Sequence, residues 1–255
     1  MNTVIYYFSG TGNSLTTARM IADGLGDTRL VSIASKKDCL SISENAERVG
    51  FVFPIYYGNM PYSVRELISK TVFKPDAFIF SVCTYRGHSG DIALRMDQLL
   101  RTRGRTLSLS LGLPMPGNSF INAPEVDQEH LKNQKANVLS IIEKIELGEK
   151  EDYYSKKVLL STPVDIASNF RGIKADDNCT GCGLCAMICP RNNIKIEDGR
   201  AQMGEDCVSC LACFHWCSRE AIYMSKQENI ARRKKYHHPD IDVQDMILQK
   251  YDTEE

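Results

Sequence analysis

The chain has 255 residues, enough for one large domain or two smaller ones with cores of their own. Its 31 basic and 32 acidic residues give a formal net charge of −1, so charge offers no reason to expect nucleic acid or an anionic membrane as a partner. With 43% hydrophobic and 25% charged residues, the composition is that of an ordinary globular protein. Residues 1–8 lack a basic region, and no run approaches the roughly 20 apolar residues of a membrane span. We therefore expect a cytoplasmic protein that is not bound to a membrane.

The ten cysteines divide the chain. Only Cys39 and Cys83 lie in the first 178 residues, and the other eight lie between 179 and 217. A cytosolic protein rarely keeps four disulfides, so a cluster of this kind indicates metal binding. We expect an α/β domain over residues 1–167, a cysteine-rich domain over 168–226, and a C-terminal tail over 227–255 that contains a short helix.

Short apolar runs alternate with amphipathic patterns through the first domain. Five runs predict strands, at 4–8, 30–33, 49–55, 77–83 and 106–111. The amphipathic patterns predict helices at about 15–25, 61–68, 92–100 and 131–145. Strands and helices in alternation predict a doubly wound parallel sheet of five strands, which binds its ligand at the carboxyl ends of the strands.

The turn between the first strand and the first helix has the composition of an anion cradle. Gly10 and Gly12 let the backbone curl, and the helix N-terminus adds a partial positive charge. Further donors are the hydroxyls of Ser9, Thr11 and Ser14 and the amide of Asn13. No lysine lies in the turn, which suits one terminal phosphate held by neutral groups. The alternative is a glycine-rich turn without a ligand.

The first domain resembles the flavodoxins over about residues 1–115. Ser9, Thr11, Gly12 and Ser14 match the phosphate loop of that family, S/T-x-T-G-x-T/S. The resemblance implies that the loop holds the phosphate of FMN and that two further loops hold the flavin ring. These loops contribute Pro54, Tyr57, Gly58 and Asn59 after the third strand, and Thr84, Tyr85, Arg86, Gly87 and Gly90 after the fourth. Asn59 stands where some flavodoxins have an acid, and Arg86 is either a ring-side cation or a solvated loop residue.

The cysteine-rich domain contains two runs of similar spacing. Cys179, Cys182, Cys185 and Cys189 are spaced C-x2-C-x2-C-x3-C and precede a proline; Cys207, Cys210, Cys213 and Cys217 repeat the spacing and precede Ser218. Soft thiolates at this spacing favour two [4Fe–4S] clusters over zinc. The fourth cysteine of each run is expected to bind the other run's cluster, which pairs Cys217 with the first run and Cys189 with the second. Residues 172–226 resemble the bacterial two-cluster ferredoxins, which have an α+β fold.

The whole chain resembles the flavodoxin–ferredoxin fusion proteins of anaerobes. The resemblance implies a protein that passes low-potential electrons between two [4Fe–4S] clusters and FMN, and onward to a partner protein or a small-molecule acceptor. Two alternatives are an FMN-dependent reductase of a small substrate and a non-catalytic redox sensor. No residue is a convincing catalytic acid, so whether the protein is an enzyme stays open, as does a homodimer.

The tail is polar and basic, with an Arg-Arg-Lys-Lys run at 232–235 followed by His237 and His238. Its composition favours a solvated segment over a docking patch or a metal-binding histidine pair. The apolar residues Val243, Met246 and Ile247 predict a short amphipathic helix that packs back on a domain.

Overall fold

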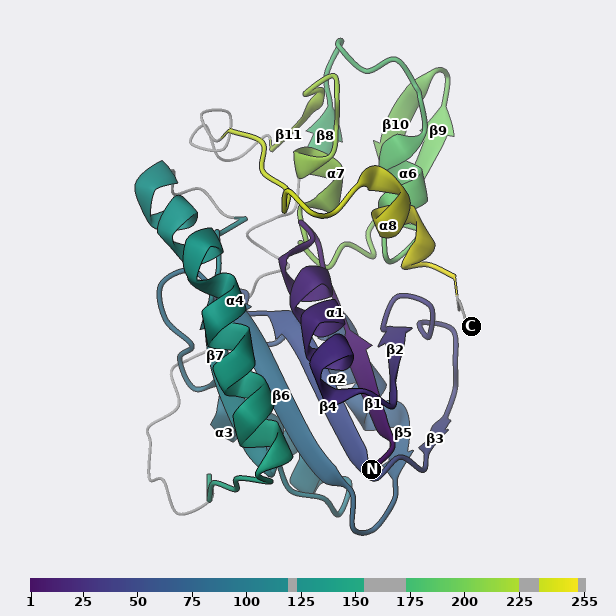
Figure 1. Cartoon of the computed structure of the whole chain (residues 1–255). Coiled ribbons are helices and arrows are strands. Elements are labelled where there is room, and N and C mark those ends of the chain that lie inside the picture. The colour runs from purple at the N-terminus through teal and green to yellow at the C-terminus, as the bar shows by residue number, and fades with distance from the viewer. Residues whose placement is uncertain (119–122, 154–172, 225–233, 252–255) are drawn as a thin grey trace.

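The first domain is built on one parallel sheet. The computed structural model describes residues 1–118, 123–153, 173–224 and 234–251 (Figure 1). The strands are β1 (Thr3–Tyr7), β2 (Thr28–Ser32), β4 (Arg48–Pro54), β6 (Phe78–Tyr85) and β7 (Leu109–Pro114), in the order β2-β1-β4-β6-β7 and parallel throughout. This is the strand order of the flavodoxin-like doubly wound fold. The predicted fold class is therefore confirmed.

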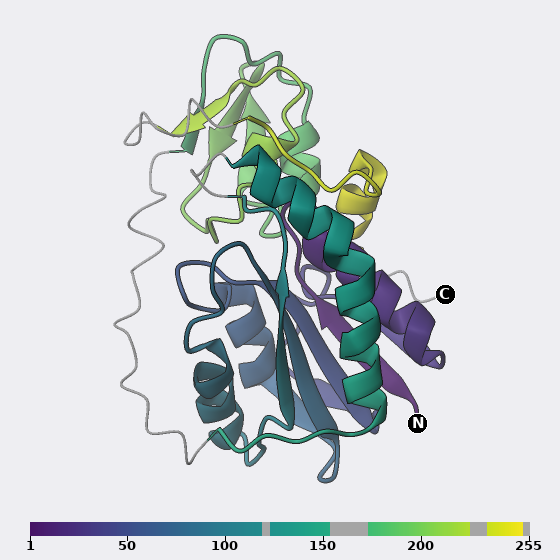
Figure 2. The ribbon, with the colours of Figure 1, turned by 60° about the vertical axis from the view of Figure 1, so that its left-hand side comes forward.

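Helices cover both faces of the sheet. α1 (Asn13–Leu25) and α4 (Pro124–Glu146) lie on one face, and α2 (Tyr62–Lys70) and α3 (Ile92–Arg101) lie on the other (Figure 2). Every residue of β1 is buried, which explains why this strand is apolar at consecutive positions rather than at alternate ones. Within the described residues, no helix is both long enough and apolar enough to cross a membrane.

The expected elements agree with the structure except at their ends. All five predicted strands and four predicted helices are present, and the largest shift is in α4, expected at about 131–145 and found at Pro124–Glu146. A second, two-stranded parallel sheet joins β3 (Ile42–Glu44) to β5 (Thr71–Phe73). Neither of these two strands was predicted, because three residues are too few to show a hydrophobic periodicity.

The cysteine-rich domain lies beyond the carboxyl ends of the large sheet (Figure 1). It contains two antiparallel pairs, β8 (Ile173–Ala175) with β11 (Ile222–Met224), and β9 (Ile194–Glu197) with β10 (Arg200–Met203). The third cysteine of each run lies in a short helix: Cys185 in α6 (Leu184–Ile188) and Cys213 in α7 (Ala212–His215). The expected domain boundary at 167/168 lies outside the described residues.

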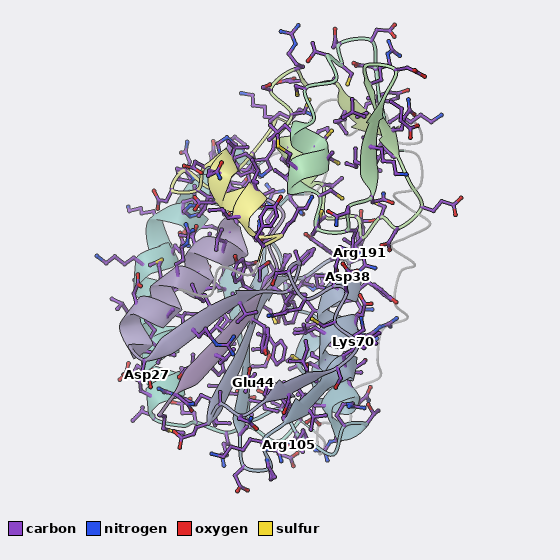
Figure 3. All side chains as sticks on the ribbon, turned by 90° about the vertical axis from the view of Figure 1, so that its right-hand side faces the viewer. Asp27, Asp38, Glu44, Lys70, Arg105 and Arg191 are labelled. Carbon is purple, nitrogen blue, oxygen red and sulfur yellow. The ribbon has the colours of Figure 1, made fainter. Side chains whose placement is uncertain are left out.

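The two domains share one core and an ion-pair network. Ile188, Ala212 and Trp216 of the small domain are buried in the same apolar cluster as the sheet and its helices. Arg191 adds a polar connection, because its guanidinium lies 2.7 Å from Glu66 on α2 and 2.9 Å from Asp206. Figure 3 labels Arg191 where the small domain meets the sheet domain. Partial burial would raise the pKa of Glu66, but hydrogen bonds from Lys70 and Arg191 lower it overall. The small domain is therefore fixed against the sheet domain rather than tethered to it.

The described part of the tail, residues 234–251, packs across both domains, and we call it the C-terminal strap. It ends in the predicted helix, α8 (Val243–Leu248), which begins with a capping box formed by Asp242 and Asp245. The expectation of a solvated tail is wrong for this segment, since the side chain of His238 is only 1% exposed and Trp216 stacks on His237 at 4.4 Å. Arg232 and Arg233 lie outside the described residues.

Candidate functional site

A hollow lies where the strands of the sheet end and the small domain begins. It has a cavity volume of about 140 Å³, is open to solvent on one side, and is bounded by loops that follow β1, β4, β6 and β7. Ten of the fifteen expected flavin residues line it: Ser9, Gly10, Thr11, Asn13, Ser14, Pro54, Tyr57, Thr84, Tyr85 and Arg86. The topology thus brings three separate loops to one cavity, as expected at the carboxyl edge of a parallel sheet.

The phosphate loop has the conformation of an anion cradle. The backbone N–H of Gly12 donates to Ser9 Oγ at 3.1 Å, and Gly12 has a φ of 95°, which a residue with a Cβ rarely adopts. In the part of the chain that the structure describes, the backbone N–H groups of Thr11, Asn13 and Ser14 have no protein acceptor. These residues are nonetheless buried. Unsatisfied N–H groups at a buried helix N-terminus are what a phosphate requires, so the loop fits the group predicted for it.

The other donors of the loop are partly used by the protein. Ser14 Oγ lies 2.9 Å from Thr84 Oγ1, which ties the phosphate loop to the loop after β6. Asn13 Nδ2 donates to the carbonyl oxygen of Pro116 at 2.7 Å, which leaves the second hydrogen of this amide for a ligand.

Five expected residues do not line the hollow, and four of them shape its ring loops. Tyr57 and Gly58 have φ values of 50° and 75° and form the tip of a tight turn closed by two backbone hydrogen bonds between Tyr56 and Asn59. Asn59 uses its side-chain oxygen to accept from the N–H of Met60, and Gly90 lies behind Gly58. Gly12, Gly58, Asn59, Gly87 and Gly90 are therefore placed to shape the loops around the hollow rather than to form its lining.

Arg86 is not the solvated loop residue that the sequence left possible, and a place beside the flavin ring stays a prediction. It lines the hollow, but its guanidinium forms an ion pair with Asp127 on α4 at 3.2 Å and lies 3.4 Å from the carbonyl oxygen of Ala123. Its charge is thus largely balanced by α4. The residue joins the loop after β6 to the first turn of that helix.

Sequence reasoning missed part of the lining. Ile55, Tyr56, Met115, Pro116, Gly117 and Asn118 also face the hollow. Asn118 joins the domains, because its Nδ2 donates to the carbonyl oxygen of Cys210 at 3.2 Å and lies 3.4 Å from the hydroxyl of Tyr56. The position of residues 115–118 after β7, at the same sheet edge, points to their loop, whereas Ile55 and Tyr56 continue the loop after β4.

The remaining wall of the hollow comes from the second cysteine run. Ser209 and Leu211 line the cavity on either side of Cys210. The contact with the phosphate loop is close, since a Cβ added at Gly10 would overlap the carbonyl oxygen of Cys210. Trp216 also stabilises this contact between the second cysteine run and the phosphate loop, because its Nε1–H donates to the carbonyl oxygen of Gly10 at 3.1 Å.

The eight clustered cysteines gather in two sets of four. The pKa of Cys185 is raised to about 11, by burial and then by negative charge at Cys179, Cys182 and Cys217. We call these four the distal set; they line a small pocket of about 20 Å³. The pKa of Cys213 is raised by burial and then by Cys210, Cys207 and Cys189, which with it form the proximal set. The membership of the two sets crosses the two runs, as the resemblance to two-cluster ferredoxins predicts, but among the described residues no three of these side chains are arranged to hold a single metal ion.

The two runs have equivalent backbones but different residues at their left-handed positions. In the first run these positions are Gly181 and Gly183, with φ values of 67° and 81°. In the second run they are Ser209 and Leu211, with φ values of 56° and 58°. A non-glycine residue is strained in this region. The strained residues are the two that line the hollow.

Comparisons with known proteins agree with the cluster motif. Residues 174–195 match the family model of a 4Fe-4S binding domain. The chain thus combines a flavodoxin-like domain with a 4Fe–4S binding domain. Over 57 residues it is 37% identical to DNA-directed RNA polymerase subunit Rpo3 of Methanosarcina mazei, a match that covers 21% of each chain.

Solved flavodoxins show weak overall similarity. A flavodoxin from the domain Archaea is 16% identical, with a TM-score of 0.36, over 57% of this chain and 99% of the other. The two-electron reduced flavodoxin of Megasphaera elsdenii is 19% identical, also with a TM-score of 0.36, over 54% of this chain and 98% of its own. The fold class follows from the strand order, not from these matches.

Proposed function

We propose that this protein is an electron-transfer iron–sulfur flavoprotein, in which two [4Fe–4S] clusters exchange low-potential electrons with one FMN and pass them to a partner. One observation carries the proposal. The hollow bounded by the phosphate loop is closed on its other side by Ser209 and Leu211 of the second cysteine run. A ligand in the hollow and a metal group on Cys207, Cys210 and Cys213 would therefore be neighbours in a single chain.

Bound FMN would supply one- or two-electron exchange, and each iron–sulfur cluster would supply single electrons. The residues of the chain bring these groups together. Cys210 and Asn118 fix the second cysteine run against the hollow, and Tyr56 is 5% exposed beneath it. Because both halves belong to one chain, their exchange needs no encounter between molecules.

The two cysteine sets support an order of transfer. The proximal set lies against the hollow, whereas the pocket of the distal set shares no lining residue with it. The sets are nonetheless adjacent, since Cys185 of the distal set adds to the shift in the pKa of Cys213. Electrons would enter through the distal set, where Cys182 is exposed, and reach the flavin through the proximal set.

The open side of the hollow supports an onward partner rather than an enclosed substrate. Tyr57 is 39% exposed there, and among the described atoms none lies within 4 Å of a Cβ added at Gly58 or Gly87. An exposed edge suits contact with a partner protein. It favours the carrier over a reductase that binds its substrate in a closed cavity.

The phosphate loop provides the first test of this function. Replacing Thr11 and Ser14 together by alanine removes two hydroxyl donors to a charged ligand, worth roughly 1.5–3 kcal/mol each. FMN affinity of the anaerobic protein, measured by flavin fluorescence, should fall sharply, whereas the affinity for riboflavin, which lacks the phosphate, should change little. Equal weakening of both ligands would contradict the phosphate assignment.

Cofactor content provides the second test. Anaerobic reconstitution with iron, sulfide and FMN should give about eight irons and one flavin per chain. The reconstituted protein should then pass electrons from a low-potential reductant to a one-electron acceptor faster with FMN than without it. A full complement of clusters with no effect of FMN would contradict the proposed role.

A further inference from the structure

The C-terminal strap contacts three consecutive residues of the phosphate loop. The N–H of His238 donates to the carbonyl oxygen of Thr11 at 2.8 Å. A Cβ added at Gly12 would lie 2.9 Å from Cβ of Ile241. The hydroxyl of Tyr236 donates to Asn13 Oδ1 at 2.6 Å. A segment more than 220 residues away in the sequence thus packs against the phosphate loop.

These contacts fix the side chain of Asn13. Its Oδ1 accepts from Tyr236, while its Nδ2 donates to Pro116. An amide held in this way cannot turn over, because the flipped group would place its oxygen against the carbonyl oxygen of Pro116. Since Asn13 lines the hollow, Tyr236 helps to decide that the amide offers N–H, rather than oxygen, to a ligand there.

The strap is itself held firmly at both ends. Near its start, the N–H of Tyr236 donates to Nδ1 of the buried His215, which also lies 2.9 Å from the carbonyl oxygen of Asn118 through Nε2. Near its end, Asp245 forms an ion pair with Arg19 on α1 at 2.5 Å, and Lys250 donates to the carbonyl oxygen of Ala186 at 3.0 Å. A segment anchored in this way can position a side chain.

His238 fixes the middle of the strap. Its Nδ1 accepts from the N–H of Asp240 at 3.2 Å, so the hydrogen of the neutral ring is on Nε2, which donates to Gln134 Oε1 at 2.8 Å. The side chain fills a buried site between α4 and the phosphate loop. Its backbone N–H is therefore held where the carbonyl of Thr11 needs a donor.

We infer that the C-terminal strap braces the phosphate loop and that Tyr236 is a positioning residue, which holds the Asn13 amide with its N–H toward the terminal phosphate of the bound flavin. The inference rests on the proposed function, because it assumes that the loop binds a phosphate. It adds a residue outside the three flavin loops. It also predicts that FMN is preferred over riboflavin partly because of the strap.

The test compares FMN and riboflavin in the full-length, reconstituted protein. Tyr236→Phe should raise the dissociation constant of FMN about tenfold, the effect of one lost hydrogen bond, and leave that of riboflavin within about twofold. Tyr251→Phe is the matched control, because Tyr251 is an exposed tyrosine of the same strap. Asn13→Ala should weaken FMN similarly, and the double variant should be no weaker than Asn13→Ala alone. The ³¹P resonance of bound FMN should shift in Tyr236→Phe and not in the control.

Each outcome decides a separate point. If Tyr236→Phe weakens FMN and riboflavin equally, or if its effect adds fully to that of Asn13→Ala, the strap only joins the domains and the inference is overturned. If the unmodified protein itself binds riboflavin as tightly as FMN, the phosphate loop and the proposed function fail instead.

Discussion

The two cysteine runs have the same spacing, yet they lie in different surroundings. In the first run, the two positions with a left-handed backbone conformation are Gly181 and Gly183, and glycine adopts this conformation with the least strain. The second run places Ser209 and Leu211 there, and both line the hollow beside the phosphate loop. Equal spacing therefore predicts two similar metal sites, while the residues between the cysteines differ where the second run lines the hollow.

The largest difference is expected when one ligand is removed from each set. Cys182→Ser and Cys210→Ser should each lose about half of the iron, since each removes one ligand of one cluster. Only Cys210→Ser should also weaken FMN binding, because Cys210 is 8% exposed and lies against Gly10 and Asn118. Anaerobic iron and sulfide analysis with flavin titration measures both effects. Equal FMN affinity in the two variants would remove the distinction between the sets.

The contact between the second run and the phosphate loop can be broken from the other side. Gly10→Ala should cost about 1–3 kcal/mol in unfolding free energy, because the added methyl group would overlap the carbonyl oxygen of Cys210. Gly87→Ala is the control, with open space around its Cβ. Denaturant unfolding should distinguish the variants. If Gly10→Ala behaves like Gly87→Ala, the domains do not pack as described.

Exchanging the left-handed residues sharpens the comparison further. Ser209→Gly gives the second run the residue found at Gly181, so the iron content should be unchanged and the unfolding free energy should rise by about 1 kcal/mol as strain is relieved. FMN affinity should fall several-fold, because a wall residue of the hollow is removed. Unchanged FMN affinity would mean that Ser209 has a role only in the conformation of the second cysteine run and none in FMN binding.

The smallest expected effect is that of pH on the strap. Burial lowers the pKa of His238 below its usual value of 6.5. A depressed pKa means that the folded protein favours the neutral ring, so the contribution to stability is complete above pH 6.5 and is lost as the pH falls through the lower, folded-state pKa. Thermal unfolding followed from pH 7.5 to pH 5 should show this loss in the natural protein. His238→Gln should remove that part of the pH dependence, and an unchanged profile would exclude His238 as its source.

Much of the sheet domain could be predicted because its signals are local. The apolar run of β1, the glycines of the phosphate loop and the cysteine spacings lie within short stretches, and each was assigned from them. The eight cysteine ligands and the flavin loops stay predictions, but the structure places them in two sets of four and around one hollow.

The remainder depends on contacts between distant segments. Asn118 joins Tyr56 to Cys210, and no local pattern relates these three residues. The polar composition of the strap predicted a solvated segment. His238 is nonetheless buried, because its ring finds a hydrogen-bond partner in Gln134 and the residue packs on the phosphate loop. Polarity alone does not show whether a buried polar group will find a partner.

The central claim is that the proximal set delivers electrons to the flavin within one chain. The direct test is flash reduction of the reconstituted Cys182→Ser variant, which should keep only the proximal cluster, with flavin absorbance followed at several protein concentrations. The account predicts a first-order phase of flavin reduction whose rate does not depend on protein concentration, and which is absent in Cys210→Ser. A rate that rises in proportion to protein concentration, or an unchanged phase in Cys210→Ser, would contradict it.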